Sequence, residues 1–175
     1  MDDVITPLLD SDQIAQRVRE MGAAIARDYQ GRPLILVCVL KGSFVFAADL
    51  ARAIDGPVRI EFLGVRSYGA GTTSSGVVQI THDLQRSIEG EDVLLVEDIV
   101  DTGLTLSYLQ DVLRARDPKS LRTACLLSKP SRRKVDVQVE YIGFEIEDKF
   151  VVGYGLDHAG QFRHLPFIGI QDDLT

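Results

Sequence analysis

The chain has 175 residues, a length typical of one compact domain that can bury its own core. Hydrophobic residues make up 45% and charged residues 26%, which excludes a disordered chain and a small disulfide framework. The net charge of −7 opposes general binding to a nucleic-acid backbone, so a polyanionic ligand has to be captured locally. We therefore expect a single domain over residues 1–175 that binds no nucleic acid.

Two features predict a cytoplasmic protein. The N-terminus has no basic start before an apolar stretch, and the longest strongly apolar run, residues 34–40, is too short to span a bilayer. Cys38 and Cys125 each lie in an apolar run, and their spacing matches neither a zinc site nor a redox pair. We expect reduced core thiols and no membrane partner.

The first predicted element is a helix over about residues 10–28. Asp10 followed by Gln13 is typical of a helix start, and apolar residues then recur at helical spacing from Ile14 to Ile25. This pattern predicts an amphipathic helix with one buried face.

The next segments alternate between strands and helices. Strands are predicted over residues 34–40, 58–65, 92–96 and 121–127, and helices over residues 43–54 and around Leu106, Leu109 and Leu113. Two short extended pieces follow over residues 139–146 and 150–154, and residues 156–170 are predicted to be irregular. The alternation favours an α/β fold with a mostly parallel sheet flanked by helices, in which ligands bind beyond the carboxyl ends of the strands.

Residues 67–76 interrupt this alternation. They contain glycine and hydroxyl residues and have no hydrophobic period, which predicts a long loop. A long loop inside a compact domain is either functional or a floppy surface connection, and both readings stay open from these residues alone.

The segment from Val93 to Thr105 carries the chemistry. A buried strand leads through Glu97-Asp98 and Asp101-Thr102-Gly103 into a helix. Backbone N–H groups and the positive end of the helix dipole converge at such a junction and form an anion site. Because the segment lacks the Gly-Lys-Ser/Thr ending of a P-loop, a single phosphate fits better than a triphosphate.

Three carboxylates, Glu97, Asp98 and Asp101, stand next to this anion site. They would repel a phosphate unless they bound something else, such as sugar hydroxyls or a divalent cation carried by the ligand. The combination predicts a phosphorylated sugar with magnesium. Taken alone, Asp101 could instead be a cap that satisfies the helix N–H groups.

The thirteen residues from Val93 to Thr105 resemble the 5-phosphoribosyl pyrophosphate (PRPP) motif of type I phosphoribosyltransferases. The resemblance extends over nearly the whole chain and is greatest to the hypoxanthine/guanine phosphoribosyltransferases; its further matches are Leu40-Lys-Gly-Ser43, Ser67-Tyr68, Lys129, residues 145–157 and Arg163. It implies the fold of that family, with a small hood formed by the terminal segments. It also implies purine salvage, in which PRPP and hypoxanthine or guanine give IMP or GMP and pyrophosphate.

The resemblance implies a role for each residue of the PRPP motif. Glu97 and Asp98 would hold the ribose hydroxyls, partly through Mg²⁺, and Asp101 would be the general base that takes the proton from purine N7. The 5′-phosphate would be held by the backbone and hydroxyl groups of Asp101, Thr102, Gly103, Leu104 and Thr105.

Other matching positions would bind the leaving group. Lys41 and Gly42 would lie in the pyrophosphate loop, which in the family often has a non-proline cis peptide before the lysine. Arg163 would clamp pyrophosphate, and Asp157 would bind a second magnesium ion through water. The resemblance also makes Ser67 and Tyr68 the start of a lid over PRPP.

Four matching positions would surround the purine. Lys129 would donate to O6, which selects 6-oxopurines over adenine. Phe150 and Val151 would stack on the ring and bind its edge through backbone groups, with Asp157 beside them. Read in isolation, Lys129 is an ordinary strand-end lysine, and Phe150 and Val151 are ordinary core residues.

Two alternatives stay open. A phosphoribosyltransferase for another base is one, and xanthine is harder to exclude than adenine because it also carries a 6-oxo group. A regulatory protein that senses PRPP or binds nucleic acid is the other. The resemblance implies a homodimer or homotetramer. The basic run of Arg132, Arg133 and Lys134 is predicted to be a solvated turn without function, and no histidine is expected to bind a metal.

Overall fold

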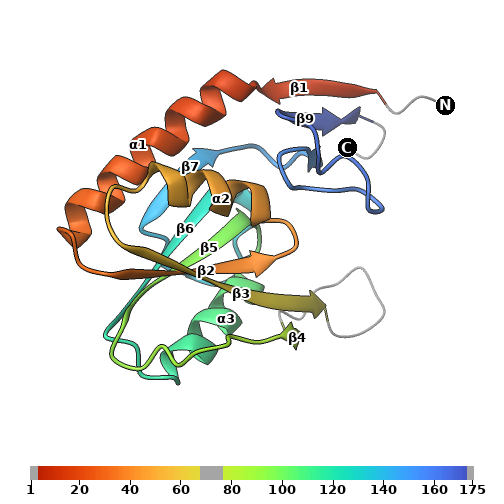
Figure 1. Ribbon diagram of the computed structural model, residues 1–175. Helices are drawn as coiled ribbons and strands as arrows, with labels where there is room; N and C mark the ends of the chain where they lie inside the picture. Colours follow the sequence, from red (N-terminus) through yellow and green to blue (C-terminus); the bar gives the residue numbers. More distant parts are fainter. Residues whose placement is uncertain (1–3, 68–76, 173–175) are drawn as a thin grey trace.

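Two β-sheets and three α-helices make up the chain in its computed structural model, which describes residues 4–67 and 77–172 (Figure 1). The large sheet has six strands in the order β4-β3-β2-β5-β6-β7, and the small sheet has the order β1-β9-β8. The elements are β1 (Ile5–Leu9), α1 (Ser11–Tyr29), β2 (Leu34–Leu40), α2 (Phe44–Ala53), β3 (Val58–Ser67), β4 (Val78–His82), β5 (Asp92–Val100), α3 (Leu104–Arg114), β6 (Ser120–Ser128), a 3₁₀ turn (Pro130–Arg132), β7 (Tyr141–Glu145), β8 (Val151–Val152) and β9 (Ile168–Gln171).

Helix α1 begins as its sequence predicts. The carboxylate of Asp10 accepts from the backbone N–H of Gln13 at 2.8 Å, and the Gln13 side chain accepts from the backbone N–H of Asp10 at 2.9 Å. The buried face runs from Ile14 to Tyr29, and the helix ends at Gln30, which is left-handed with a φ of 51°. The predicted helix over residues 10–28 is confirmed.

The large sheet separates two hydrophobic cores. Successive residues of β2 point to opposite faces, so Leu36 and Cys38 pack against α1 and α2, while Val37 and Val39 pack on the side of α3. Figure 1 shows the same division, with α1 and α2 on one face of the sheet and α3 on the other. Strands β3, β2, β5, β6 and β7 are parallel, and only β4 runs antiparallel at the edge. The predicted α/β class is confirmed.

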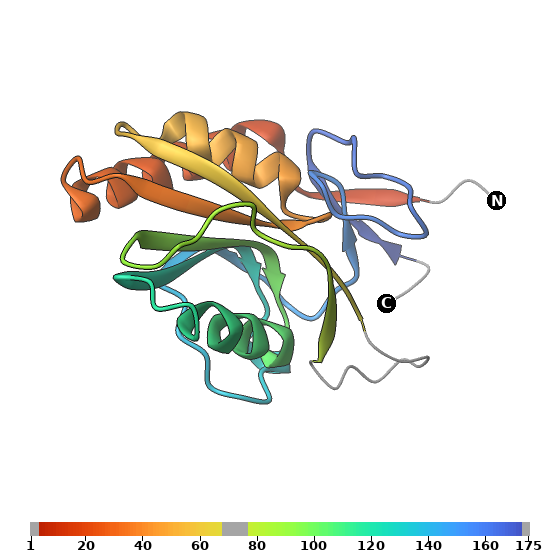
Figure 2. The same cartoon turned by 60° about the horizontal axis from the view of Figure 1, so that its bottom comes forward.

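The terminal segments form the small sheet. Strands β1 and β9 pair antiparallel, from Ile5 with Gln171 to Leu9 with Ile168, and β8 pairs with the other edge of β9. In Figures 1 and 2 this sheet lies beside the end of the large sheet at which β2 and β3 finish. It is the hood that the family resemblance implies.

Three strands were not predicted. The sequence pattern predicts no strand at β1 or β4, and it predicts an irregular segment over residues 156–170 although β9 begins at Ile168. Each of these strands has only four or five residues and lies in a small sheet or at a sheet edge, so the hydrophobic alternation is short and weak.

Both cysteines are free and buried, as predicted. Burial raises the pKa of the Cys38 thiol, and it raises the pKa of Cys125 to about 12. Such thiols stay protonated at neutral pH and are poor nucleophiles. Among the described residues, no helix is long and apolar enough to cross a membrane.

Gly22 tests the close packing of α1 against α2. On helix propensity alone, Gly22→Ala would stabilise the protein by about 1 kcal/mol. A Cβ at Gly22 would, however, collide with the carbonyl oxygen of Ala53 at the end of α2. Overpacking costs about 1–3 kcal/mol, so we expect a lower free energy of unfolding in urea denaturation. Ala23→Gly, on the exposed side of α1, is the control and should lose about 1 kcal/mol through propensity only. A higher free energy of unfolding for Gly22→Ala than for the wild type would contradict the close approach of α1 and α2 at this residue.

Candidate active site

One cavity of about 450 Å³ opens at the carboxyl ends of β2, β3 and β5. Ligands of open parallel sheets bind at this edge because the loops that follow the strands converge there. Eleven of the predicted site residues line the cavity; they are Lys41, Gly42, Ser67, Glu97, Asp98, Asp101, Thr102, Gly103, Thr105, Asp157 and Arg163. They come from segments more than 100 residues apart in the sequence, and the fold brings these segments together around the cavity.

The phosphate-binding turn follows β5 and precedes α3. Gly103 has a φ of +85°, a left-handed conformation that suits glycine, and it starts the helix without a side-chain cap. Thr102 Oγ1 accepts from the backbone N–H of Leu104 at 3.3 Å. The carboxylate of Asp101 points elsewhere and bonds Arg132, so the capping alternative for Asp101 is excluded. The N-terminus of α3 therefore faces the cavity as an anion site.

Glu97 and Asp98 form a buried pair of carboxylates at the end of β5. Glu97 is 7% exposed, and Asp98 accepts from the backbone N–H of Ile99 at 2.6 Å. Burial raises the pKa of Glu97 well above its ordinary value, and repulsion from Asp98 raises it further. Burial also raises the pKa of Asp98, while the guanidinium of Arg163 partly opposes this.

This pair fits a magnesium ion that arrives with a phosphorylated ligand. Mg²⁺ is usually held by one or two carboxylates and completed by substrate phosphates and water. Glu97, Asp98 and Asp157 supply hard oxygen donors in one cavity. In residues 4–67 and 77–172, no group of three or more acidic, histidine or cysteine side chains is arranged to hold a metal by itself.

Lys41 and Gly42 form the turn after β2. The peptide between Leu40 and Lys41 is cis, a conformation that the sequence alone left open. Gly42 lies directly against the carboxylate of Asp98, and a Cβ at Gly42 would collide with it. Any residue other than glycine would therefore displace one of the two buried carboxylates.

Asp157 and Arg163 reach the cavity from the hood. Their side chains form an ion pair at 3.0 Å, and Arg163 also donates to the carbonyl oxygen of Gly155 at 2.6 Å. Asp157 accepts from the backbone N–H of Gly160 at 2.8 Å. These bonds hold both side chains in place before a ligand binds, with one cation and one carboxylate available to the cavity.

Of the four predicted purine-binding residues, Asp157 lines this cavity, whereas Lys129, Phe150 and Val151 are not among the residues that line it. Lys129 is 7% exposed; its backbone N–H donates to the carbonyl oxygen of Val100 at 2.9 Å, and its Nζ lies 3.4 Å from Oδ1 of Asp148. Val151 is buried, whereas Phe150 is 37% exposed and contacts the ring of His158 edge-on with centroids 5.5 Å apart. The exposed ring of Phe150 leaves a face free for a planar ligand.

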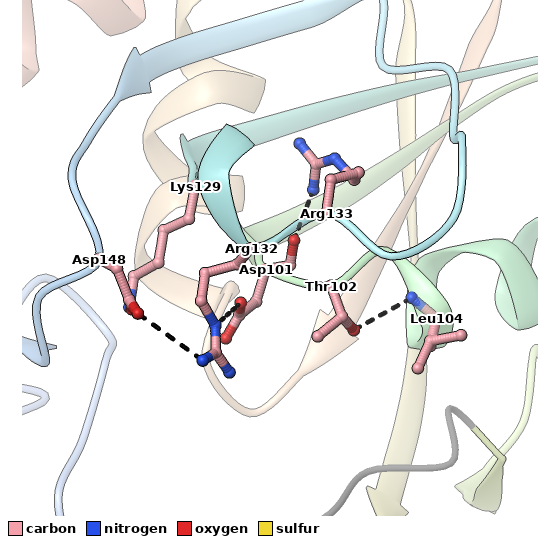
Figure 3. A network of polar contacts seen from close by, with 7 residues as sticks. All are labelled: Asp101, Thr102, Leu104, Lys129, Arg132, Arg133 and Asp148. Carbon is pink, nitrogen blue, oxygen red and sulfur yellow. Dashed lines mark hydrogen bonds and ion pairs between the residues drawn. The ribbon is translucent and has the colours of Figure 1, made fainter.

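The basic run after β6 lies in an exposed turn, as predicted, but two of its arginines also contact Asp101. Arg132 Nε donates to Oδ1 of Asp101 at 2.9 Å, and Arg133 donates to the carbonyl oxygen of Asp101 at 2.8 Å (Figure 3). Arg133 also donates to Ser128 Oγ at 2.8 Å. No pattern in the sequence indicates these bonds, because three neighbouring charges do not reveal which acidic group lies across from them. Both arginines belong to the site.

The two remaining predicted site residues are Leu104 and Tyr68. Leu104 begins α3 and is not among the residues that line the cavity, so it can offer only its backbone to a phosphate. Tyr68 lies outside the described residues, whereas its neighbour Ser67 ends β3 and lines the cavity.

Comparison with known proteins identifies the class to which this fold and site belong. Residues 5–159 match the family model of the phosphoribosyl transferase domain, which covers most of the chain. The chain therefore belongs to the phosphoribosyltransferase family, and within it to the hypoxanthine-guanine phosphoribosyltransferases, as the following relatives indicate.

Three relatives illustrate the similarity. The hypoxanthine-guanine phosphoribosyltransferase of Mycobacterium tuberculosis is 49% identical over 176 residues, which cover 97% of this chain and 87% of the relative. A crystal structure of the Bacillus anthracis enzyme, with HEPES in its active site, is 46% identical with a TM-score of 0.90 and coverage of 94% and 96%. The hypoxanthine phosphoribosyltransferase of Trypanosoma cruzi in complex with the product IMP is 44% identical with a TM-score of 0.91 and coverage of 98% and 96%.

Proposed function

We propose that this chain transfers the 5-phosphoribosyl group from PRPP to N9 of hypoxanthine or guanine and releases pyrophosphate. The products are IMP or GMP, so the reaction salvages purine bases. The observation that carries the proposal is that one cavity at the carboxyl edge of the sheet contains an anion-binding turn, a carboxylate pair and two cationic side chains, Lys41 and Arg163. Family membership and the IMP complex of the Trypanosoma cruzi relative support the same reaction.

The turn from Asp101 to Thr105 binds the 5′-phosphate of PRPP in this proposal. Backbone N–H groups at the start of α3 and the hydroxyls of Thr102 and Thr105 supply the donors. Glu97 and Asp98 accept from the ribose 2′- and 3′-hydroxyls. A ligand fixed at both its phosphate and its ribose presents the anomeric carbon toward the purine, which lowers the entropic cost of the reaction.

Lys41, Gly42 and Arg163 bind the pyrophosphate leaving group. Negative charge grows on its oxygens as the bond to the ribose carbon breaks, and cations already in place stabilise that charge. Mg²⁺, bound with PRPP and held by Glu97, Asp98 and Asp157, would neutralise further charge on these oxygens. The two buried carboxylates also lie near the sugar, where positive charge develops during bond breaking.

Asp101 and Lys129 act on the purine in this proposal. Asp101 takes the proton from N7 as N9 forms its bond to ribose, and Lys129 donates to O6. Phe150 stacks on the purine ring, with His158 on its edge, and Val151 offers backbone groups to the purine edge. Adenine presents an amino group in place of O6 and would place a donor opposite the ammonium of Lys129, which can only donate.

The direct test is a panel of bases. The protein is incubated with PRPP, Mg²⁺ and either hypoxanthine, guanine, xanthine or adenine, and nucleotide formation is followed by absorbance or chromatography. We expect turnover of hypoxanthine, guanine or both, with adenine inactive. Activity that depends only on xanthine or adenine, or no activity with any base, would overturn the proposal.

Asp101→Asn removes the proton acceptor and keeps the shape of the side chain. Because general-base catalysis contributes about 10²–10⁴-fold, we expect nucleotide formation to slow by that factor while PRPP binding, measured by calorimetry, changes little. Asp111→Asn, on the exposed face of α3, is the matched control and should retain full activity. An unchanged rate for Asp101→Asn would remove Asp101 from the role of base.

Lys129→Gln replaces the donor to O6 with an amide that can also accept a hydrogen bond. We expect the ratio of kcat/KM for hypoxanthine over adenine to fall by about tenfold or more, because an adenine amino group then faces an amide that can accept instead of an ammonium that can only donate. Lys119→Gln, at the opposite end of β6, serves as the control and should keep the ratio. Full discrimination against adenine in Lys129→Gln would contradict the assigned specificity.

Other expectations from the sequence stay predictions. They are the cytoplasmic location, a homodimeric or homotetrameric assembly, the single domain over residues 1–175 and the covering role of Ser67 and Tyr68. Light scattering of the purified protein would measure the oligomeric state directly.

A further inference from the structure

A chain of four charged side chains connects the two groups that would meet the purine (Figure 3). Arg132 Nε bonds Oδ1 of Asp101 at 2.9 Å, Arg132 Nη1 lies 3.6 Å from Oδ2 of Asp148, and Asp148 Oδ1 lies 3.4 Å from Nζ of Lys129. Two cations alternate with two carboxylates, so the group as a whole is neutral. Arg132 stands in the middle and contacts both acids.

The bond from Arg132 uses only one of the two carboxylate oxygens of Asp101. Within residues 4–67 and 77–172, Oδ1 of Asp101 has Arg132 as its hydrogen-bond partner, and Oδ2 has none. A proton acceptor works best when a third group fixes its orientation and leaves one acceptor atom free. The geometry at Asp101 meets both conditions.

We infer that Arg132 is a positioning residue that orients Asp101 toward the purine. The inference rests on the proposed function, because it needs Asp101 to act on a purine. Arg132 holds one carboxylate oxygen and turns the other toward N7–H, and Asp148 holds the guanidinium from its far side. The same acid also fixes Lys129, so the two atoms that recognise the purine are set relative to each other.

Folding stability gives no sufficient reason for this arrangement. The side chains of Arg132 and Asp101 are 46% and 41% exposed, and exposed ion pairs contribute little to stability. Arg132 ends a short 3₁₀ turn on the surface, so its replacement should leave the fold intact. An effect of substitution therefore reports on the site.

Arg133 provides a contrast in the neighbouring position. It bonds the backbone carbonyl of Asp101 and the buried Ser128, and its Cδ packs closely beside Gly103. Arg133 thus supports the backbone of the phosphate-binding turn, whereas the guanidinium of Arg132 bonds the carboxylate of Asp101 and not its backbone. Loss of each arginine should therefore weaken a different half of the site.

The test compares Arg132→Gln with the wild-type protein in single-turnover formation of IMP at saturating PRPP, Mg²⁺ and hypoxanthine. We expect the rate to fall about tenfold, with the Kd for PRPP unchanged within about twofold by calorimetry. Arg132→Lys, which restores the charge near Asp101, should recover part of the rate. Arg114→Gln, which breaks an exposed pair with Asp111 on α3, is the control and should match the wild type.

For Arg133→Gln we expect the opposite result: the main effect is a higher Kd for PRPP, and the single-turnover rate at saturating PRPP changes less. An unchanged or faster rate for Arg132→Gln would overturn the inference, since it would mean that Arg132 is idle or competes with the purine. An equal loss of PRPP affinity in Arg132→Gln would also overturn it, because the residue would then support the turn. If wild-type protein forms no IMP, the proposed function itself fails; if only the variants behave unexpectedly, this inference alone fails.

Discussion

The pairing of β5 with β6 is the constraint on which the whole site depends. The parallel register runs from Asp92 with Ser120 to Val100 with Ser128, well past the apolar part of β5. The next backbone bond, from Lys129 to the carbonyl oxygen of Val100, extends this register by one more step. The phosphate-binding turn after β5 and the lysine after β6 therefore leave the sheet side by side, and the 3₁₀ turn after Lys129 brings Arg132 to Asp101.

The same extension of β5 explains the electrostatics of the cavity. Glu97 and Asp98 are still part of the strand, so the sheet holds them where they are desolvated. Buried carboxylates are costly when they lack cationic or hydrogen-bonding partners. Burial raises the pKa of Asp98, and backbone hydrogen bonds and the guanidinium of Arg163, which comes from the hood, oppose that rise only in part. A cation bound with the ligand, as in the proposed function, would offset part of this cost.

The sequence predicts the elements whose signals are local and long. The first helix has a capping pair and a full amphipathic face, and the central strands are continuous apolar runs, so these elements follow from periodicity alone. The short strands β1, β4 and β9 depend on partners far along the chain, and a four- or five-residue pattern cannot identify those partners. The contacts of Arg132 and Arg133 with Asp101 are equally hard to predict, because they join residues that only the folded chain brings together.

Close contacts between backbones join the hood to the rest of the site. Gly155 has a φ of +99°, and a Cβ there would collide with the carbonyl oxygen of Gly42 in the pyrophosphate loop. Gly42 in turn lies against Asp98. The hood therefore contacts the pyrophosphate loop, and the loop contacts the carboxylate pair. Strands β1 and β9 close the hood, and Thr6 Oγ1 donates to Asp172 at 2.6 Å across almost the full length of the chain. The placement of Asp157 and Arg163 consequently depends on the pairing of both terminal segments, although neither segment contributes a residue that lines the cavity.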